Sequence, residues 1–230
     1  MSKISKIALV PAVALLALAA AGSARAADLS VAPIYKAPPV ATPQAYNWSG
    51  FYLGLNGGGG WGTSSWDTAG SFNVSGGVVG GTAGVNWEIG HAVIGLEGDV
   101  DWSSLKGGTT SALCPAGCTT NNDWLATVRG RAGYAFDRVM PYLTGGLAAG
   151  DIKASTPGFA GATQSSAGWT AGGGVELALT SNWTAKAEYL HVDLGNMNCG
   201  FNCGVVANNN VSLKSDLVRG GVNFRFGGGN

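Results

Sequence analysis

Eight segments of alternating apolar and polar residues follow one another along the chain. They predict β-strands, because a period of two separates the two faces of a strand. We predict strands at 48–61, 74–87, 93–104, 124–135, 141–150, 168–179, 183–191 and 217–226. The connections are alternately long and short, at 62–73, 88–92, 105–123, 136–140, 151–167, 180–182 and 192–216. Long loops at one end and tight turns at the other are typical of an all-β fold, the eight-stranded antiparallel up-and-down transmembrane β-barrel, here over residues 48–230.

The first 26 residues have the features of a cleaved signal peptide. Lys3 and Lys6 form a basic start, residues 7–21 are apolar, and residues 24–26 have the small-x-small pattern of a cleavage site. A membrane-spanning helix is the alternative, but the apolar run is short for a span of roughly 20 residues. The sequence therefore predicts an exported protein.

Residues 27–47 belong to neither the signal nor the strands. Four of the eight prolines are here, at Pro33, Pro38, Pro39 and Pro43. Proline cannot donate a ladder hydrogen bond, so we predict an extended periplasmic leader. A docking peptide for a periplasmic partner is the alternative.

Composition narrows the class further. Loss of Lys3, Lys6 and Arg25 with the signal leaves 10 of the 13 basic residues against 13 acidic ones. This slightly negative chain gives no reason to expect nucleic-acid binding. The mature length suits one barrel of about eight strands and is too short for a porin of about sixteen.

Aromatic residues end the apolar face of most predicted strands. Amphipathic rings are favoured at membrane–water interfaces, so we predict two aromatic girdles. The outer girdle is Trp61, Trp102, Trp124 and Trp169, and the inner girdle is Trp87, Tyr134, Trp183 and Phe226. The alternative is that these are core aromatics of a soluble sandwich.

The opposite strand faces carry charges, which we expect to point into the lumen. Five are acidic and five basic: Glu97, Asp99, Asp101, Glu176, Glu188, Arg129, Arg131, Lys186, Arg219 and Arg225. The three acidic residues at 97–101 lie one strand from Arg129 and Arg131, so cross-strand pairing is available. We expect paired charges that stabilise the barrel; an ion path or proton relay is the alternative.

Four cysteines occur in two closely spaced pairs within the second and fourth long connections, at Cys114, Cys118, Cys199 and Cys203. An exported chain favours disulfides over zinc. The spacing favours the local bridges 114–118 and 199–203, but cross-loop pairing and a four-thiol zinc site remain open.

The remaining motifs are weak. Gly57, Gly59 and Gly62 match a dinucleotide-type pattern, but no βαβ unit surrounds them. His91 and His191 lack a third metal ligand in the sequence pattern, so we predict no metal, no cofactor and no catalytic residue. A Ser–His hydrolase site at His191 is the enzymatic alternative.

Five sequence segments together resemble a known family: ADLSVAPIYKAPP (27–39), NWSGFYLGLNGGGGWG (47–62), PYLTGGLAAG (141–150), NWTAKAEYLHVDLG (182–195) and LVRGGVNFRF (217–226). The chain resembles the small outer-membrane β-barrel proteins and surface antigens of alphaproteobacteria, within the OmpA-like and porin-family barrels. The resemblance covers essentially the whole mature chain. It implies a Gram-negative outer-membrane location and a structural, envelope-integrity or surface-interaction role without catalysis. A narrow porin-like diffusion channel for small solutes or ions is the alternative.

The resemblance also implies partners. We expect outer-membrane lipids around the barrel, surface or host ligands at the long loops, and recognition of the C-terminal strand by the assembly machinery. Family members typically end on an aromatic residue, whereas here residues 227–230 follow Phe226.

Overall fold

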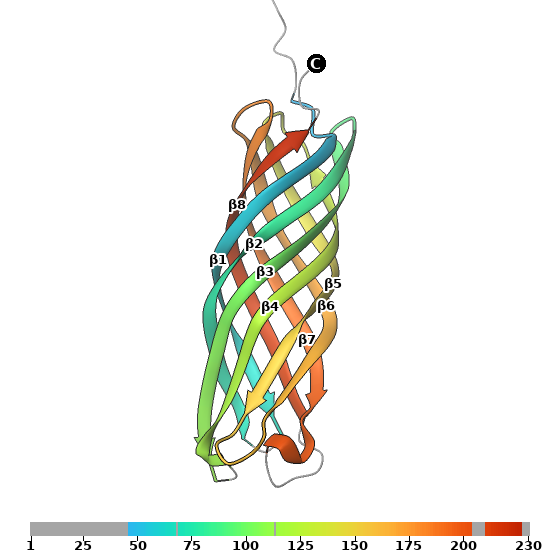
Figure 1. The fold of residues 1–230 in the computed structure, drawn as a ribbon. Coiled ribbons are helices and arrows are strands. Elements are labelled where there is room, and N and C mark those ends of the chain that lie inside the picture. Colours follow the sequence, from blue (N-terminus) through green and yellow to red (C-terminus); the bar gives the residue numbers. More distant parts are fainter. Residues whose placement is uncertain (1–45, 68, 113, 204–209, 227–230) are drawn as a thin grey trace, which may run out of the picture. The chain divides into compact units, whose positions relative to one another are not determined.

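The computed structural model describes residues 46–67, 69–112, 114–203 and 210–226. The predicted signal peptide (1–26), all but the last two residues of the leader (27–47) and the C-terminal residues 227–230 lie outside these ranges. The described strands form one closed antiparallel barrel in sequence order, with the first and last strands paired (Figure 1). The predicted eight-stranded up-and-down barrel is thereby confirmed. The strands are β1 (Gly50–Trp66), β2 (Gly70–Ile89), β3 (Ala92–Ser111), β4 (Cys114–Tyr134), β5 (Val139–Ser155), β6 (Ala162–Ala178), β7 (Trp183–Asn198) and β8 (Asn210–Phe226).

The two ends of the barrel differ in their connections. At the turn end, residues 90–91, 135–138 and 179–182 join the strands. At the loop end, the connections are 67–69, 112–113, 156–161 and 199–209, and the last includes the short 3₁₀ helix η1 (Gly200–Cys203). Within the described residues, no helix is long and apolar enough to span a membrane.

The prediction of four long loops was wrong. Most of residues 62–73, 105–123, 151–167 and 192–216 extends the strands toward the loop end. The predicted strands ended where bulky apolar residues stop pointing outward. Beyond that level the outward residues are small or polar, such as Thr63, Asn73 and Thr163, while the inward residues become apolar.

Bulges interrupt the ladder near this change. The β4–β5 register shifts between Asn121 and Leu125, and the buried carboxylate of Asp151 accepts hydrogen bonds there from the backbone N–H groups of Asp123 and Trp124, at 2.8 and 3.1 Å. The β7–β8 register shifts between Asp193 and Asn196. Each bulge adds a residue to one strand, which changes the parity of inward positions.

The barrel interior has three layers. A turn-end cluster of Trp48, Val93, Ala135, Met140, Tyr142 and Ala178 fills one end. A charged layer follows, and then a loop-end cluster that includes Trp66, Leu105, Ile152, Leu194 and Leu213. The expectation of a lumen lined by charges therefore holds for one layer, while the interior of the loop-end half is mostly apolar, with a few buried polar side chains such as Asn122 and Asp151.

Candidate functional site

The ten charged side chains predicted to face the lumen are all buried, with at most 4% relative exposure. They come from β3, β4, β6, β7 and β8. The strand alternation places them inward, opposite outward apolar neighbours such as Leu96 and Val128.

Arg129 and Arg219 connect most of the acidic groups. Arg129 donates to Glu97 at 2.5 Å, to Asp99 at 3.0 Å and to Glu188 at 3.1 Å. Arg219 donates from Nε to Glu188 at 2.8 Å and from Nη1 to Asp99 and Asp101, each at 2.5 Å. Three carboxylates around each guanidinium compensate much of the cost of burying it.

Arg131 and Lys186 complete this layer. Arg131 donates to Glu176 at 2.7 Å and to the hydroxyl of Tyr52 at 3.1 Å. The Lys186 ammonium lies 2.9 Å from Glu97 Oε2, which also accepts a hydrogen bond from the Tyr52 hydroxyl at 2.7 Å. Arg131 and Lys186 are thus connected through the Tyr52 hydroxyl and the Glu97 carboxylate.

The predicted pairing between neighbouring strands describes part of this network. Glu97 and Arg129 are register partners on β3 and β4 and do pair. The short pair of Arg131 is with Glu176 on β6, however, and Asp101 pairs with Arg219 on β8. A narrow barrel brings strands that are not ladder neighbours within reach of each other across the lumen.

Glycines make room for this layer. A Cβ atom on Gly80 would lie 2.1 Å from Asp101 Oδ1, and one on Gly84 would lie 2.3 Å from the Tyr52 ring. Both distances are far inside van der Waals contact, so these two positions leave space for the large interior side chains.

Arg225 has a different environment from the other nine charges. It donates to the backbone carbonyls of Asn47 at 2.7 Å and Ser49 at 2.6 Å, and its guanidinium lies 5.0 Å from the Tyr46 ring centre. Trp48, completely buried, donates from Nε1 to the carbonyl of Asp137 at 2.9 Å. The residues before β1 are therefore fixed across the turn end of the lumen.

One cysteine pair lies in a connection, as predicted, and the other does not: Cys199 and Cys203 are in the β7–β8 connection. Cys114 and Cys118 are on β4 rather than in a loop, and Cys203 ends η1. The structure contains both local disulfides, Cys114–Cys118 and Cys199–Cys203, and all four residues are buried in the loop-end cluster.

Thr156 joins the two disulfides. Its hydroxyl lies 3.5 Å from Cys118 Sγ and donates to the carbonyl of Cys203 at 3.1 Å. One disulfide therefore lies within β4 and the other in the connection after β7, and the Thr156 side chain contacts a residue of each.

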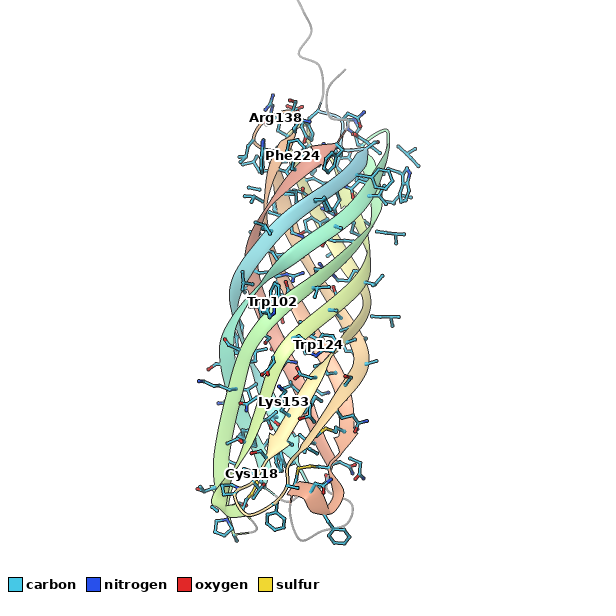
Figure 2. All side chains as sticks on the ribbon, viewed as in Figure 1. Trp102, Cys118, Trp124, Arg138, Lys153 and Phe224 are labelled. Carbon is cyan, nitrogen blue, oxygen red and sulfur yellow. A yellow bond between two sulfur atoms is a disulfide. The ribbon has the colours of Figure 1, made fainter. Side chains whose placement is uncertain are left out.

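Outside the barrel, the predicted girdle residues mostly point outward. Trp61, Trp87, Trp102, Tyr134, Trp169, Trp183 and Phe226 are exposed, and Trp124 is half-buried. The prediction that the outer girdle lies at the strand ends was wrong, because its four residues lie in the strand interiors. Figure 2 shows Trp102 and Trp124 well inside the barrel length, with Lys153 and Cys118 nearer the loop end. A band of exposed large apolar residues separates the two girdles, among them Leu55, Val79, Leu96, Val128 and Leu147.

The two histidines lie on the exterior. The ring of His91 stacks on Tyr134, and Nδ1 of His191 lies 2.8 Å from Asp216 Oδ1. Among the described residues, no group of three or more histidine, cysteine or acidic side chains is arranged to hold a metal ion.

Sequence reasoning missed several side chains of these sites. Tyr52, Tyr142 and Trp48 are aromatic residues that point inward, and Asp151 and Thr156 fell in predicted loops. For Tyr52, the signal was available, since it alternates with the outward residues Phe51 and Leu53. Trp48, Asp151 and Thr156 act through contacts distant in sequence, which no local pattern encodes.

An apolar exterior band between aromatic girdles, around a polar interior layer, defines a transmembrane β-barrel. Residues 13–226 match the family described as "Outer membrane protein beta-barrel domain". The chain is 37% identical to the 31 kDa outer-membrane immunogenic protein of Brucella melitensis, over 90% of this chain and 95% of that protein.

Two further relatives agree. The 25 kDa outer-membrane immunogenic protein of Brucella canis is 33% identical, over 84% of this chain and 88% of that protein. The 22 kDa outer membrane protein of Rhizobium leguminosarum bv. viciae is 35% identical, over 65% of each. The chain belongs to this family of outer-membrane β-barrel proteins, and its relatives here are alphaproteobacterial.

Proposed function

We propose that this protein is a non-catalytic structural barrel that supports envelope integrity and presents its loop-end half at the cell surface. The observation that supports this most is the layered interior. The turn-end cluster, the paired charges and the loop-end cluster follow one another along the lumen. Side chains that fill a small barrel leave little space for a solute.

The loop-end half suits a surface role. The two longest connections, 156–161 and 199–209, are both at the loop end, and longer connections are extracellular in outer-membrane barrels, so we expect this end to lie outside the cell. There Phe159 in the β5–β6 loop and Phe201 in η1 are exposed. Surface ligands would contact these loops. The Brucella relatives are named immunogenic, which is consistent with exposure at the surface.

The C-terminal strand suits recognition during assembly. β8 ends at Phe226, which is half-exposed and follows Phe224 by one alternation of the strand. Its pairing with β1 closes the barrel, so we propose that the assembly machinery contacts β8 before that pairing forms.

Two measurements on the same protein test the role. Cells that lack the protein are expected to become more sensitive to detergent, and the purified barrel is expected to give no discrete currents in a planar bilayer. Wild-type detergent resistance in the deletion strain would contradict the envelope role. Stable currents whose selectivity changes in Arg129→Ala would instead favour the diffusion channel.

A further inference from the structure

The charged layer of the lumen contains one more acidic side chain than basic side chains. Among the described residues, five carboxylates of this layer are matched by four cations, from Arg129, Arg131, Lys186 and Arg219. Arg225 does not contribute, because it bonds backbone carbonyls at the turn end and lies six residues from Arg219 along β8, roughly 20 Å. The layer therefore has one uncompensated negative charge, which is costly between two apolar clusters.

Asp101 has the fewest partners of the five carboxylates. Its one ion pair among the described residues joins Oδ2 to Nη1 of Arg219, and that nitrogen also donates to Asp99. Its other oxygen, Oδ1, accepts no hydrogen bond from any described residue, although Asp101 is completely buried. Each of the other four carboxylates contacts at least two basic or hydroxyl-bearing side chains. The uncompensated charge of the layer is therefore centred on Asp101.

A second oxygen without a donor lies across one glycine from Asp101. The buried Asn56 on β1 donates from its amide nitrogen to Thr82 Oγ1 at 3.0 Å, while its Oδ1 accepts no hydrogen bond within the described part of the chain. Gly80 on β2 is the register partner of both Asn56 and Asp101. A Cβ atom on Gly80 would lie 2.1 Å from Asp101 Oδ1, so this oxygen reaches over the glycine. A carboxylate oxygen and an amide oxygen therefore flank the same position, and both lack a partner there.

We propose that the charged layer binds one sodium ion between Asp101 Oδ1 and Asn56 Oδ1. Carboxylate and amide carbonyl oxygens are the ligands that hard cations prefer. The charge count selects a monovalent ion, because one positive charge neutralises the layer, whereas a divalent ion would leave an excess positive charge beside Arg219. The apolar clusters close the layer at both ends, so the ion enters as the barrel folds and stabilises it. The proposal goes beyond the envelope role and does not depend on it.

Binding is tested on the full mature protein, folded in detergent micelles and unfolded by urea while sodium chloride replaces choline chloride at constant ionic strength. At saturating sodium, a tenfold rise in its concentration is expected to raise the ratio of folded to unfolded protein about tenfold, as for one bound ion. Asp101→Asn is expected to abolish this dependence, and Asn56→Leu to weaken sodium binding roughly fivefold or more. Asp123→Asn is the matched control and should keep the wild-type dependence, since the Asp123 side chain is 56% exposed on β4.

A second measurement needs no variant. Radioactive sodium present while the wild-type barrel folds is expected to stay with it through gel filtration, at one ion per barrel, because the closed layer slows release. Failure to retain sodium, or an unchanged sodium dependence in Asp101→Asn, would overturn the proposal. Wild-type stability that is independent of sodium but increases with acid, with no such increase in Asp101→Asn, would also overturn it and would assign a proton to the two oxygens instead.

Discussion

The strands have two parts: the membrane half lies between the two aromatic girdles, and the loop-end half lies beyond the outer girdle. The two halves bury opposite kinds of side chain on the same strands. On β3, Glu97 points inward and Leu96 outward; further along the same strand, Leu105 points inward and Lys106 outward. The backbone ladder continues across the change. Only the surroundings differ, because lipid faces one half and water the other. Apolar side chains leave water in both cases, and that places them outside in the membrane half and inside in the loop-end half.

This contrast assigns different sources of stability to the two halves. In the membrane half, the interior depends on completeness of ion pairing, since a charge without its partner is costly when buried. In the loop-end half, it depends on packing, as in a soluble protein. Substitutions that remove ion pairs from the membrane half or packing from the loop-end half test this difference directly.

Arg129→Ala is expected to have the largest effect. It removes the shared partner of Glu97, Asp99 and Glu188 and leaves three carboxylates with fewer donors. Breaking a buried pair costs about 3–5 kcal/mol in soluble proteins, and less where water reaches the site. The loss of stability is measured by urea unfolding, with the fraction of folded protein taken from the difference in gel migration between the folded and unfolded forms. Arg138→Ala is the control, because Arg138 is exposed in the β4–β5 turn. Equal midpoints for the two variants would show that the charged layer does not stabilise the barrel.

Leu213→Ala tests the loop-end cluster. Leu213 is 1% exposed, and removing its buried methyl groups costs about 2–5 kcal/mol in a packed core. We expect local opening at the loop end, measured as faster protease cleavage there on intact cells. Protection equal to that of the wild type would mean that this half does not behave as a packed core.

A pair of arginine substitutions compares the two exteriors. Val128→Arg places a charge in the apolar band, where the cost is about 2–4 kcal/mol near the bilayer centre. Thr163→Arg places the same side chain on the exposed face of the loop-end half, and its unfolding midpoint is expected to stay near that of the wild type. If both variants lose the same stability, the membrane does not end at the outer girdle.

Removal of one disulfide is expected to have the smallest effect. The Cys114–Cys118 bridge closes a loop with a sequence separation of 4, for which chain entropy gives about 2 kcal/mol. The double variant Cys114→Ser and Cys118→Ser should therefore fold, with increased hydrogen exchange around Thr156 and unchanged exchange near Arg129. Increased exchange in both layers would show that the two halves are energetically coupled.

Much of the membrane half was predictable from sequence. Bulky outward residues alternate there with charged inward ones, so the faces of β3 and β4 follow from a period of two. In the loop-end half the sequence predicts loops, because the outward residues there are small and polar, and because the bulges at Asn121–Leu125 and Asp193–Asn196 change the parity of the pattern.

The partners of the charged residues were predictable only in part. Glu97 and Arg129 lie on neighbouring strands, and neighbouring strands follow from an up-and-down order. The pair between Asp101 and Arg219 depends on the width of the barrel and on the stagger between β3 and β8. Neither quantity is encoded in the alternation of one strand.

The contacts of Arg225 connect the two ends of the barrel chain. Arg225 is on the last strand, and it bonds the carbonyls of Asn47 and Ser49, which precede the first strand. Synthesis runs from the N-terminus, so these bonds cannot form until the final residues of β8 have been made and paired with β1. Trp48 therefore reaches its buried position only in a finished barrel, and the accessibility of its indole ring distinguishes completed molecules from assembly intermediates.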